Sequence, residues 1–258
     1  MNTPLLVTIG NNAFEYCSNL KSINLQNTTY IGQRAFQFCC YSLTSVTAPN
    51  LVSIDNYAFF DCTALYSFNA PNCTSIGLSA FAYCSSLSYV SLPKFSSQSN
   101  LRSIFYRCSN LNNVTLGIQI INTSNYLFNN SYPYLSILNL PACTQINGLR
   151  NFYGAFYNLR SYLQQLSLPL CSYIGIGGLS SLSYIKTLSL PKCEYLANTA
   201  LYGMSRLSSL YLLNSSVVTF ETNAFYNCSV SRIYVPSSLY TQYKTTYPSL
   251  STRFTSYY

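Results

Sequence analysis

The sequence predicts a solenoid of stacked repeats with one short parallel strand in each turn. Three observations support this prediction: a period of about 23 residues, an apolar frame that recurs in each copy, and a very low content of charged residues. The chain has 258 residues, of which 49% are hydrophobic and 16% are aromatic. This composition is sufficient for a packed core and excludes a disordered chain. A fixed period of about 20 to 50 residues is the signature of repeat architectures.

The repeat is marked by a dipeptide that is Ala-Phe in six of its ten copies. The spacing between successive copies is nearly constant, and only the step from Phe128 to Phe156 is clearly longer than the others. A short insertion within 147–154 accounts for the long step. The second member of the dipeptide is, in order, Phe14, Phe36, Phe59, Phe81, Phe105, Phe128, Phe156, Leu179, Leu201 and Phe225.

One repeat, residues 76–93, shows how the parts of the unit are expected to fold. Val90 and Leu92 are separated by one polar residue, which predicts a short strand with one buried side. Pro93 lacks a ladder donor and ends the strand. Phe81 and Cys84 are three residues apart, a spacing that suits one helical or 3-10 turn packed inward. A unit this small cannot bury its own apolar face, so neighbouring units must stack.

The full pattern, Ile-x3-Ala-Phe-x2-Cys-x2-Leu-x2-Ile/Val-x-Leu-Pro, resembles the BspA-type leucine-rich repeat. The match covers residues 9–236. The resemblance implies a leucine-rich-repeat solenoid, a right-handed β/α superhelix of about ten repeats, each of about 22 to 24 residues. It also implies a non-enzymatic role in adhesion or recognition, because members of this family are mostly surface-exposed or secreted proteins of host-associated microbes.

Residues 237–258 are expected to form a C-terminal cap. Ser237 or Ser238 can N-cap a short helix that carries Tyr243 and Tyr247 on one face, and Pro248 would stop it. A cap protects the last strand edge from pairing with another chain. No similar cap and no signal peptide precede the first repeat, so we expect residues 1–258 to be a single leucine-rich-repeat domain excised from a longer protein.

The sequence argues against a nucleic-acid partner and against a membrane-spanning segment. Thirteen basic and five acidic residues give a net charge of +8, but the basic residues occur singly along the sequence. Binding to phosphates requires a concentrated basic patch, so we expect no nucleic-acid partner unless folding gathers these side chains. No apolar stretch approaches the length of about 18 residues that a membrane-spanning helix needs.

The sequence offers little for catalysis or metal binding. It contains no His, which removes the usual base of nucleophilic triads and the commonest zinc ligand. Of the five carboxylates, only Asp55 and Asp61 share one repeat. We therefore predict no catalytic residues, no metal site and no cofactor. A pocket that gathers Asp55 and Asp61 with a basic residue would contradict this prediction.

Eleven cysteines suggest a disulfide framework, but their positions follow the repeat. Most of them fall at two repeat positions, one of which holds Met204 or Leu182 in other copies. A position that accepts Met and Leu is a buried apolar one, so we expect packed free thiols and few or no disulfides. The first position holds Cys17, Cys39, Cys62, Cys84, Cys108 and Cys228, and the second holds Cys73, Cys143, Cys171 and Cys193.

The predicted ligand-binding residues lie on the outer side of the strands. One outward side chain lies between the two buried residues of each strand, and together these side chains form an uncharged stripe. The insertion adds three candidates, Arg150, Phe152 and Tyr153, although neutral drift in a tolerant loop would explain it equally. The stripe consists of Asn24, Thr47, Asn69, Ser91, Thr115, Asn139, Ser167, Ser189, Tyr211 and Tyr234.

A second stripe, next to the Ala-Phe dipeptides, is aromatic and has two interpretations. Tyrosine suits the recognition of proteins and sugars, but the same residues can simply pack against the next repeat. The leading hypothesis is a module that binds a protein or glycan, such as host extracellular matrix or another microbial surface. The alternative is a structural spacer without a ligand of its own. The aromatic stripe consists of Tyr16, Phe38, Phe60, Tyr83, Tyr106, Tyr157, Tyr202 and Tyr226.

Overall fold

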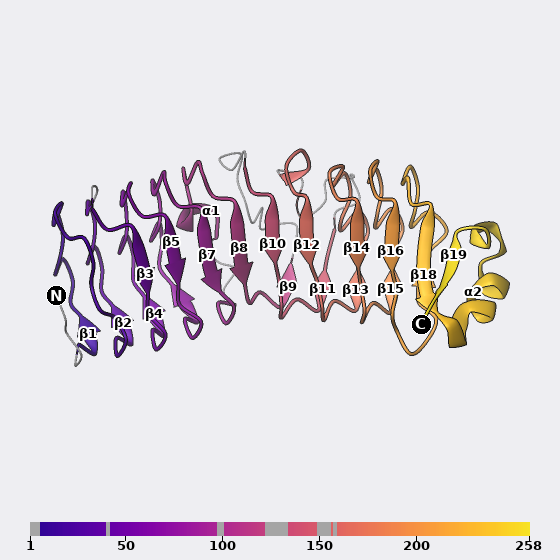
Figure 1. Cartoon of the computed structure of the whole chain (residues 1–258), viewed down its shortest axis with the longest axis horizontal. Helices are drawn as coiled ribbons and strands as arrows, with labels where there is room; N and C mark the ends of the chain where they lie inside the picture. Colours follow the sequence, from indigo (N-terminus) through magenta and orange to yellow (C-terminus); the bar gives the residue numbers. More distant parts are fainter. Residues whose placement is uncertain (1–5, 40–41, 97–100, 122–133, 149–155, 157–158) are drawn as a thin grey trace. The chain divides into compact units, whose positions relative to one another are not determined.

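The computed structural model describes residues 6–39, 42–96, 101–121, 134–148, 156 and 159–258. These residues form stacked turns whose short strands run parallel to the strands of the next turn (Figure 1). The contacts divide the chain into two units. Unit 1 comprises Met1–Ile118 and Leu127–Leu138, and unit 2 comprises Gln119–Tyr126 and Asn139–Tyr258. The expectation of a single domain stays a prediction.

Unit 1 carries two strands in most turns, where the sequence predicted one. The predicted outward-facing strands form one parallel series, and a second series starts one residue before the Ile that precedes each Ala-Phe dipeptide. A single short helix, α1 (Leu101–Ile104), is described in this unit. The first series is β3 (Ser45–Thr47), β5 (Ser67–Asn69), β7 (Tyr89–Leu92) and β8 (Asn113–Leu116); the second is β1 (Thr8–Ile9), β2 (Tyr30–Ile31), β4 (Ser53–Ile54) and β6 (Ser75–Ile76).

Unit 2 repeats this two-strand arrangement. Its second series is one five-stranded sheet of two-residue strands, β9 (Ile120–Ile121), β11 (Gln145–Ile146), β13 (Tyr173–Ile174), β15 (Tyr195–Leu196) and β17 (Thr219–Phe220). Its first series contains β12 (Gln165–Ser167) and a separate sheet of β14 (Thr187–Ser189), β16 (Ser209–Tyr211), β18 (Arg232–Pro236) and β19 (Phe254–Tyr257). One further strand, β10 (Ile137–Asn139), has residues in both units.

The segments around the Ala-Phe dipeptides that the structure describes consist of tight turns, and the helical turn expected from the spacing is wrong for most of the described repeats. Around Phe36, alternate amides bond in different directions. The amides of Ala35 and Gln37 bond within the turn, whereas those of Phe36 and Phe38 donate to carbonyls of the next turn at 2.7 and 3.0 Å. An α-helix needs every amide for its own ladder. Backbone hydrogen bonds between turns therefore replace the helical segments of the predicted β/α superhelix.

This alternation requires left-handed backbone at residues that seldom adopt it. Phe38 and Tyr83 have φ angles of 59° and 64°, a conformation that is unusual for bulky side chains. The equivalent positions in unit 2 include Gly203, with a φ of 68°. The cost at the aromatic positions is offset by the hydrogen bonds to the next turn, which form only when the turns are stacked.

The core of unit 1 is a ladder of phenylalanine rings, as the repeat predicted. Phe36, Phe59, Phe81 and Phe105 are fully buried. Neighbouring rings stack with centroids 5.0 to 5.7 Å apart and planes within 18° of parallel. Offset stacking of this kind adds about 0.5 to 1.5 kcal/mol per pair beyond the burial of area. Phe36, Phe59 and Phe81 are therefore each stabilised by rings of the turns on both sides.

The C-terminal cap exists, but it is built differently from the prediction. The helix α2 (Tyr240–Thr246) ends before Pro248, as expected, and is flanked by the 3-10 turns Ser237–Leu239 and Pro248–Leu250. The predicted N-cap is wrong, because no side chain caps either helical segment and Ser237 instead contacts the hydroxyl of Ser256 at 2.7 Å. The strand β19, which pairs with β18, was not predicted.

Tyrosine hydroxyls of the cap complete the last short strand. The backbone amide of Val218 donates to the buried hydroxyl of Tyr243 at 2.9 Å, and the amide of Phe220 donates to Tyr247 at 3.0 Å. The Tyr247 hydroxyl donates in turn to the carbonyl of Val218. The two side chains thus occupy the positions that a further turn of backbone would take beside β17.

Replacing Phe81 by Ala tests the core. We expect the substitution to lower the free energy of unfolding by about 3 to 5 kcal/mol, because it leaves a cavity between two stacked rings. Urea unfolding followed by circular dichroism measures this loss. Tyr66→Ala is the control, since Tyr66 is 59% exposed. A loss below about 1 kcal/mol for Phe81→Ala would contradict the ring ladder.

Replacing Tyr243 by Phe tests the cap. The ring is kept, but the buried amide of Val218 loses its acceptor, so the free energy of unfolding should fall by about 1 to 3 kcal/mol. Tyr240→Phe removes a hydroxyl from the same helix at a partly exposed position and should have little effect. Equal stability of the two variants in urea would show that the hydroxyl does not cap β17.

Candidate binding site

The strand face of unit 1 carries the predicted stripe in register. Thr47 of β3 is aligned with Asn69 of β5, which is aligned with Ser91 of β7, and Ser91 with Thr115 of β8. These residues alternate with fully or almost fully buried apolar side chains, so they share one face of the sheet. The periodicity therefore placed four of the candidates correctly. Whether this face binds a ligand stays a prediction.

The strand face of unit 2 continues the same pattern and ends in aromatic residues. Ser189, Tyr211 and Tyr234 are aligned on β14, β16 and β18. The rings of Tyr211 and Tyr234 stack with centroids 4.4 Å apart and planes 7° from parallel, and Tyr257 packs edge-on against Tyr211 at 5.7 Å. Desolvation, followed by the neighbouring Tyr234, raises the pKa of Tyr211. These three tyrosines form one cluster.

Four of the predicted residues lie elsewhere or outside the described chain. Asn24 is not in a strand; its side-chain oxygen accepts a hydrogen bond from the amide of Gln26 at 3.0 Å, which forms a local turn. The strand expected around Asn24 is therefore wrong. The candidates Arg150, Phe152 and Tyr153 lie outside the described residues.

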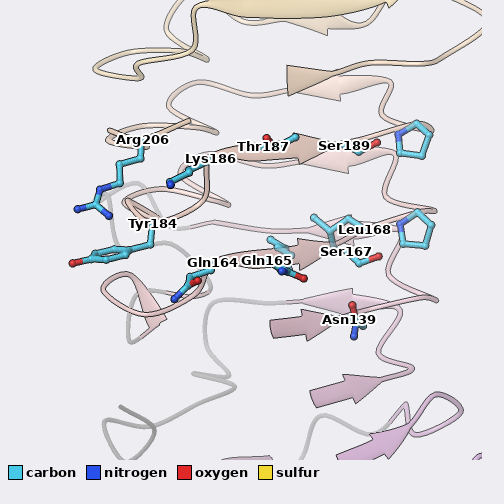
Figure 2. Close-up of a pocket in the computed structure, with 13 residues that line it drawn as sticks. Asn139, Gln164, Gln165, Ser167, Leu168, Tyr184, Lys186, Thr187, Ser189 and Arg206 are labelled. Carbon is cyan, nitrogen blue, oxygen red and sulfur yellow. The ribbon is translucent and has the colours of Figure 1, made fainter. Parts of the chain in front are cut away.

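A groove lies on the strand face of unit 2, over β12 and β14. It has a volume of about 720 Å³. Three of the predicted residues, Asn139, Ser167 and Ser189, line it, and Figure 2 shows them along one part of the groove. The remaining lining residues are Gln164, Gln165, Leu166, Leu168, Pro169, Tyr184, Lys186, Thr187, Pro191 and Arg206.

The groove coincides with a break between two sheets. Ser167 lies beside Asn139, since the amide of Leu140 donates to the Ser167 carbonyl at 3.0 Å. On its other side, β12 does not belong to the sheet that begins at β14. Leu166 in the middle of β12 is 8% exposed, whereas its counterpart Leu188 is 1% exposed. The surface is thus hollowed where the strand pairing is interrupted.

Two basic side chains gather at one end of this groove. The guanidinium carbon of Arg206 lies 4.2 Å from the centre of the Tyr184 ring, a close cation–π contact. Lys186 lies near this pair, and Figure 2 shows the three side chains together, at a distance from Ser167 and Ser189. No carboxylate is among the lining residues that the structure describes. The end of the groove is therefore positively charged.

The sequence interpretation missed these three residues because it treated the basic residues as scattered. The separation of Lys186 and Arg206 along the chain is close to one repeat, so stacking places them in adjacent turns. Tyr184 and Arg206 occupy the same repeat position, shortly before β14 in one turn and shortly before β16 in the next. Aligning the sequence by repeats would have placed Tyr184, Lys186 and Arg206 within two neighbouring turns.

The aromatic stripe packs against itself. In unit 1 the rings of Tyr16, Phe38, Phe60, Tyr83 and Tyr106 contact one another in sequence, with centroids 4.9 to 5.9 Å apart. In unit 2 Tyr202 stacks on Tyr226 at 5.8 Å, and Tyr157 lies outside the described residues. These rings contact their neighbours, although Tyr16 and Tyr226 are 67% and 60% exposed. This favours the interpretation that the stripe holds the turns together.

The possible acid–base pair has other roles. Asp55 accepts a hydrogen bond from the hydroxyl of Tyr30 at 3.1 Å and from the amide of Asn56 at 2.7 Å. Burial raises the pKa of Asp61. Neither carboxylate lines the groove. The hydrogen bonds of Asp55 join adjacent turns and stabilise a loop.

Most of the described cysteines are buried thiols, as predicted. The sulfurs of Cys39, Cys62, Cys84 and Cys108 lie 2.9 to 3.1 Å from a phenylalanine carbonyl of the preceding turn. All ten described cysteines are free. The prediction of burial is wrong for Cys17, which is exposed because its described turn has a neighbour on one side only. The thiols thus add contacts between turns.

No cluster of three or more His, Cys, Asp or Glu side chains is arranged to hold a metal ion in the described part of the chain. None of the helices formed by the described residues has the length and apolar character needed to cross a membrane.

The expected family is confirmed by comparison with known families. The model of the BspA type leucine-rich repeat region matches in six copies, over residues 3–66, 29–154 and 152–251. The chain therefore belongs to the BspA type leucine-rich repeat family, as its repeat pattern suggested. Its parallel-strand solenoid of about ten turns is of leucine-rich-repeat type. A search of curated protein sequences finds no significant match.

Several solved structures are similar to this chain. A leucine-rich repeat protein from Bacteroides ovatus is 20% identical, with 98% of this chain and 88% of that chain covered and a TM-score of 0.32. A leucine rich cell surface protein from Faecalibacterium prausnitzii is 19% identical, with coverage of 94% and 65% and a TM-score of 0.38. The mouse RP105/MD-1 complex is 16% identical, with coverage of 96% and 40% and a TM-score of 0.55.

The buried thiols predict a loss of stability in alkaline solution. Burial raises the pKa of Cys73 and of Cys193 to about 12, whereas thiols of an unfolded chain titrate near about 8.5. The folded state therefore retains protons that the unfolded state loses. Above pH 9 each thiol should lower the free energy of unfolding by about 1.4 kcal/mol per pH unit, until the folded pKa is reached.

Urea unfolding at pH 8, 9 and 10 measures this dependence. The double variant Cys73→Ala/Cys193→Ala should reduce the slope above pH 9 by about 2.7 kcal/mol per pH unit, the sum of two thiols. Cys17→Ala removes an exposed thiol and serves as the control. An unchanged slope in the double variant would mean that these two thiols are not buried in solution.

Proposed function

We propose that this chain is a non-enzymatic binding module of a microbial cell-surface or secreted protein. It recognises a protein or glycan partner through the strand face of unit 2. The observation that carries the proposal is the alignment of outward side chains on β14, β16 and β18, where the uncharged Ser189 leads to the cluster of Tyr211, Tyr234 and Tyr257. Tyrosine provides large, rigid contact area at a low entropic cost, and repeat proteins bind partners on such extended faces.

Family membership supports this function in general terms. One similar structure is described as a leucine rich cell surface protein, and another is the mouse RP105/MD-1 complex. A protein partner for this chain is consistent with such neighbours. The ligand, adhesion to host matrix or to another microbial surface, and the surface location are proposals for this chain.

Removing the strand-face tyrosines tests the proposal. The labelled chain is applied to an array of extracellular-matrix proteins and glycans, beside the variant Tyr211→Ala/Tyr234→Ala. We expect saturable binding whose affinity falls at least about tenfold in the variant, because two large contact residues are lost. The matched control is Tyr202→Ala/Tyr226→Ala, a stacked pair of the same unit that lies outside the strand face.

The array separates the two functional hypotheses. Equal losses in both tyrosine variants would move recognition away from the strand face. An absence of saturable binding to every component would favour the alternative, in which the chain is a spacer that displays another domain.

A further inference from the structure

We infer that the groove over β12 and β14 binds an acidic oligosaccharide, a short sugar chain that carries carboxylate or sulfate groups. The inference rests on the proposed function, since it assigns a ligand class to part of the same strand face. Four observations lead to it: the charge at one end of the groove, the polar groups along it, its volume, and the spacing of the two strands beneath it.

The charge selects an anion. Lys186 and Arg206 are both exposed and line the groove together, and the described lining contains no carboxylate that would neutralise them. The ring of Tyr184 lies against the guanidinium and restricts its position. A guanidinium stacked in this way still presents N–H donors along its edge, in the geometry that matches two oxygens of a carboxylate or sulfate. This end of the groove is suited to one or two anionic groups.

The polar side chains along the groove select a ligand rich in hydroxyls. Gln164, Gln165, Ser167, Thr187 and Ser189 are exposed and uncharged. Their amides and hydroxyls both donate and accept hydrogen bonds. Sugar hydroxyls have the same dual capacity, so each can be matched by a side chain of this set. An apolar ligand does not match this lining, because it would leave these polar groups without hydrogen-bond partners.

The volume of the groove argues against a large ligand, and the spacing of β12 and β14 argues against a peptide strand inserted between them. A volume of about 720 Å³ falls within the range of small-ligand sites, about 300 to 1,000 Å³. A peptide strand inserted between β12 and β14 would need two strand spacings, about 9.6 Å in total. Cα atoms of the two strands already approach within 8 Å. A ligand must therefore lie in the groove above the strands and be recognised by side chains, without pairing with the strand backbones.

The experiment measures binding of four probes of similar length to the full chain by calorimetry. The probes are an oligogalacturonate, which carries carboxylates, a heparin-derived oligosaccharide, which carries sulfates, a neutral malto-oligosaccharide, and an oligoglutamate peptide. We expect at least one acidic oligosaccharide to bind at least about tenfold more tightly than the other two classes. The affinity should fall as sodium chloride rises, because salt screens the two exposed cations.

Matched variants locate the site. Lys186→Gln/Arg206→Gln should reduce the affinity for the acidic probe at least about tenfold, whereas Lys192→Gln/Lys244→Gln removes the same charge outside the groove and should change it less than twofold. Arg206→Lys keeps the charge but loses the planar fork, so it should give an intermediate loss. The near-ultraviolet circular dichroism of each variant verifies that it is folded.

The outcomes also separate this inference from the proposed function. Equal affinity for the neutral probe, a preference for oligoglutamate, or an equal loss in both charge variants would each overturn the inference. If no acidic oligosaccharide binds while the array reveals a ligand that depends on Tyr211 and Tyr234, the inference fails and the proposed function stands. Binding of the acidic probe that depends on Arg206 supports both.

Discussion

The structure depends on hydrogen bonds that each turn donates to the next. Within the Ala-Phe segments, alternate amides satisfy their own turn and the others reach the neighbouring turn, as the amides of Phe36 and Phe38 do. A turn on its own would leave these donors without partners and would keep its aromatic residues in left-handed backbone. Stacking of the turns gives these donors their acceptors, and the new hydrogen bonds offset the cost of the left-handed backbone. The phenylalanine ladder and the buried thiols then add apolar contact along the same direction.

This dependence explains why the surface is regular enough to form a recognition face. Because each strand is held in register with its neighbours, the outward residue of one turn lies beside that of the next, as Ser189 lies beside Tyr211 and Tyr211 beside Tyr234. Uncharged hydroxyls and amides can occupy such positions without repulsion between adjacent turns. Stacking also brings Lys186 and Arg206 together from adjacent turns, and the interruption between β12 and β14 provides the hollow beside them.

The period and the apolar frame were sufficient to predict the stacked turns, the core residues such as Phe81, and the outward position of residues such as Asn69. The sequence could not reveal that the Phe81-to-Cys84 spacing corresponds to tight turns, because a spacing of three fits a helical turn equally well and only hydrogen bonds to the next turn decide between them. The second strand was missed because its two residues are too few to show alternation. The groove was missed because it arises from a break in pairing, which no single repeat encodes.

The cap has a consequence for the evolution of this protein. Tyr243 and Tyr247 make their hydrogen bonds to backbone atoms of Val218 and Phe220. The hydrogen bonds of the cap are thus made to backbone atoms, while its two rings pack against the side chain of Phe220. Gene duplication could add or delete whole turns upstream without redesigning the terminus.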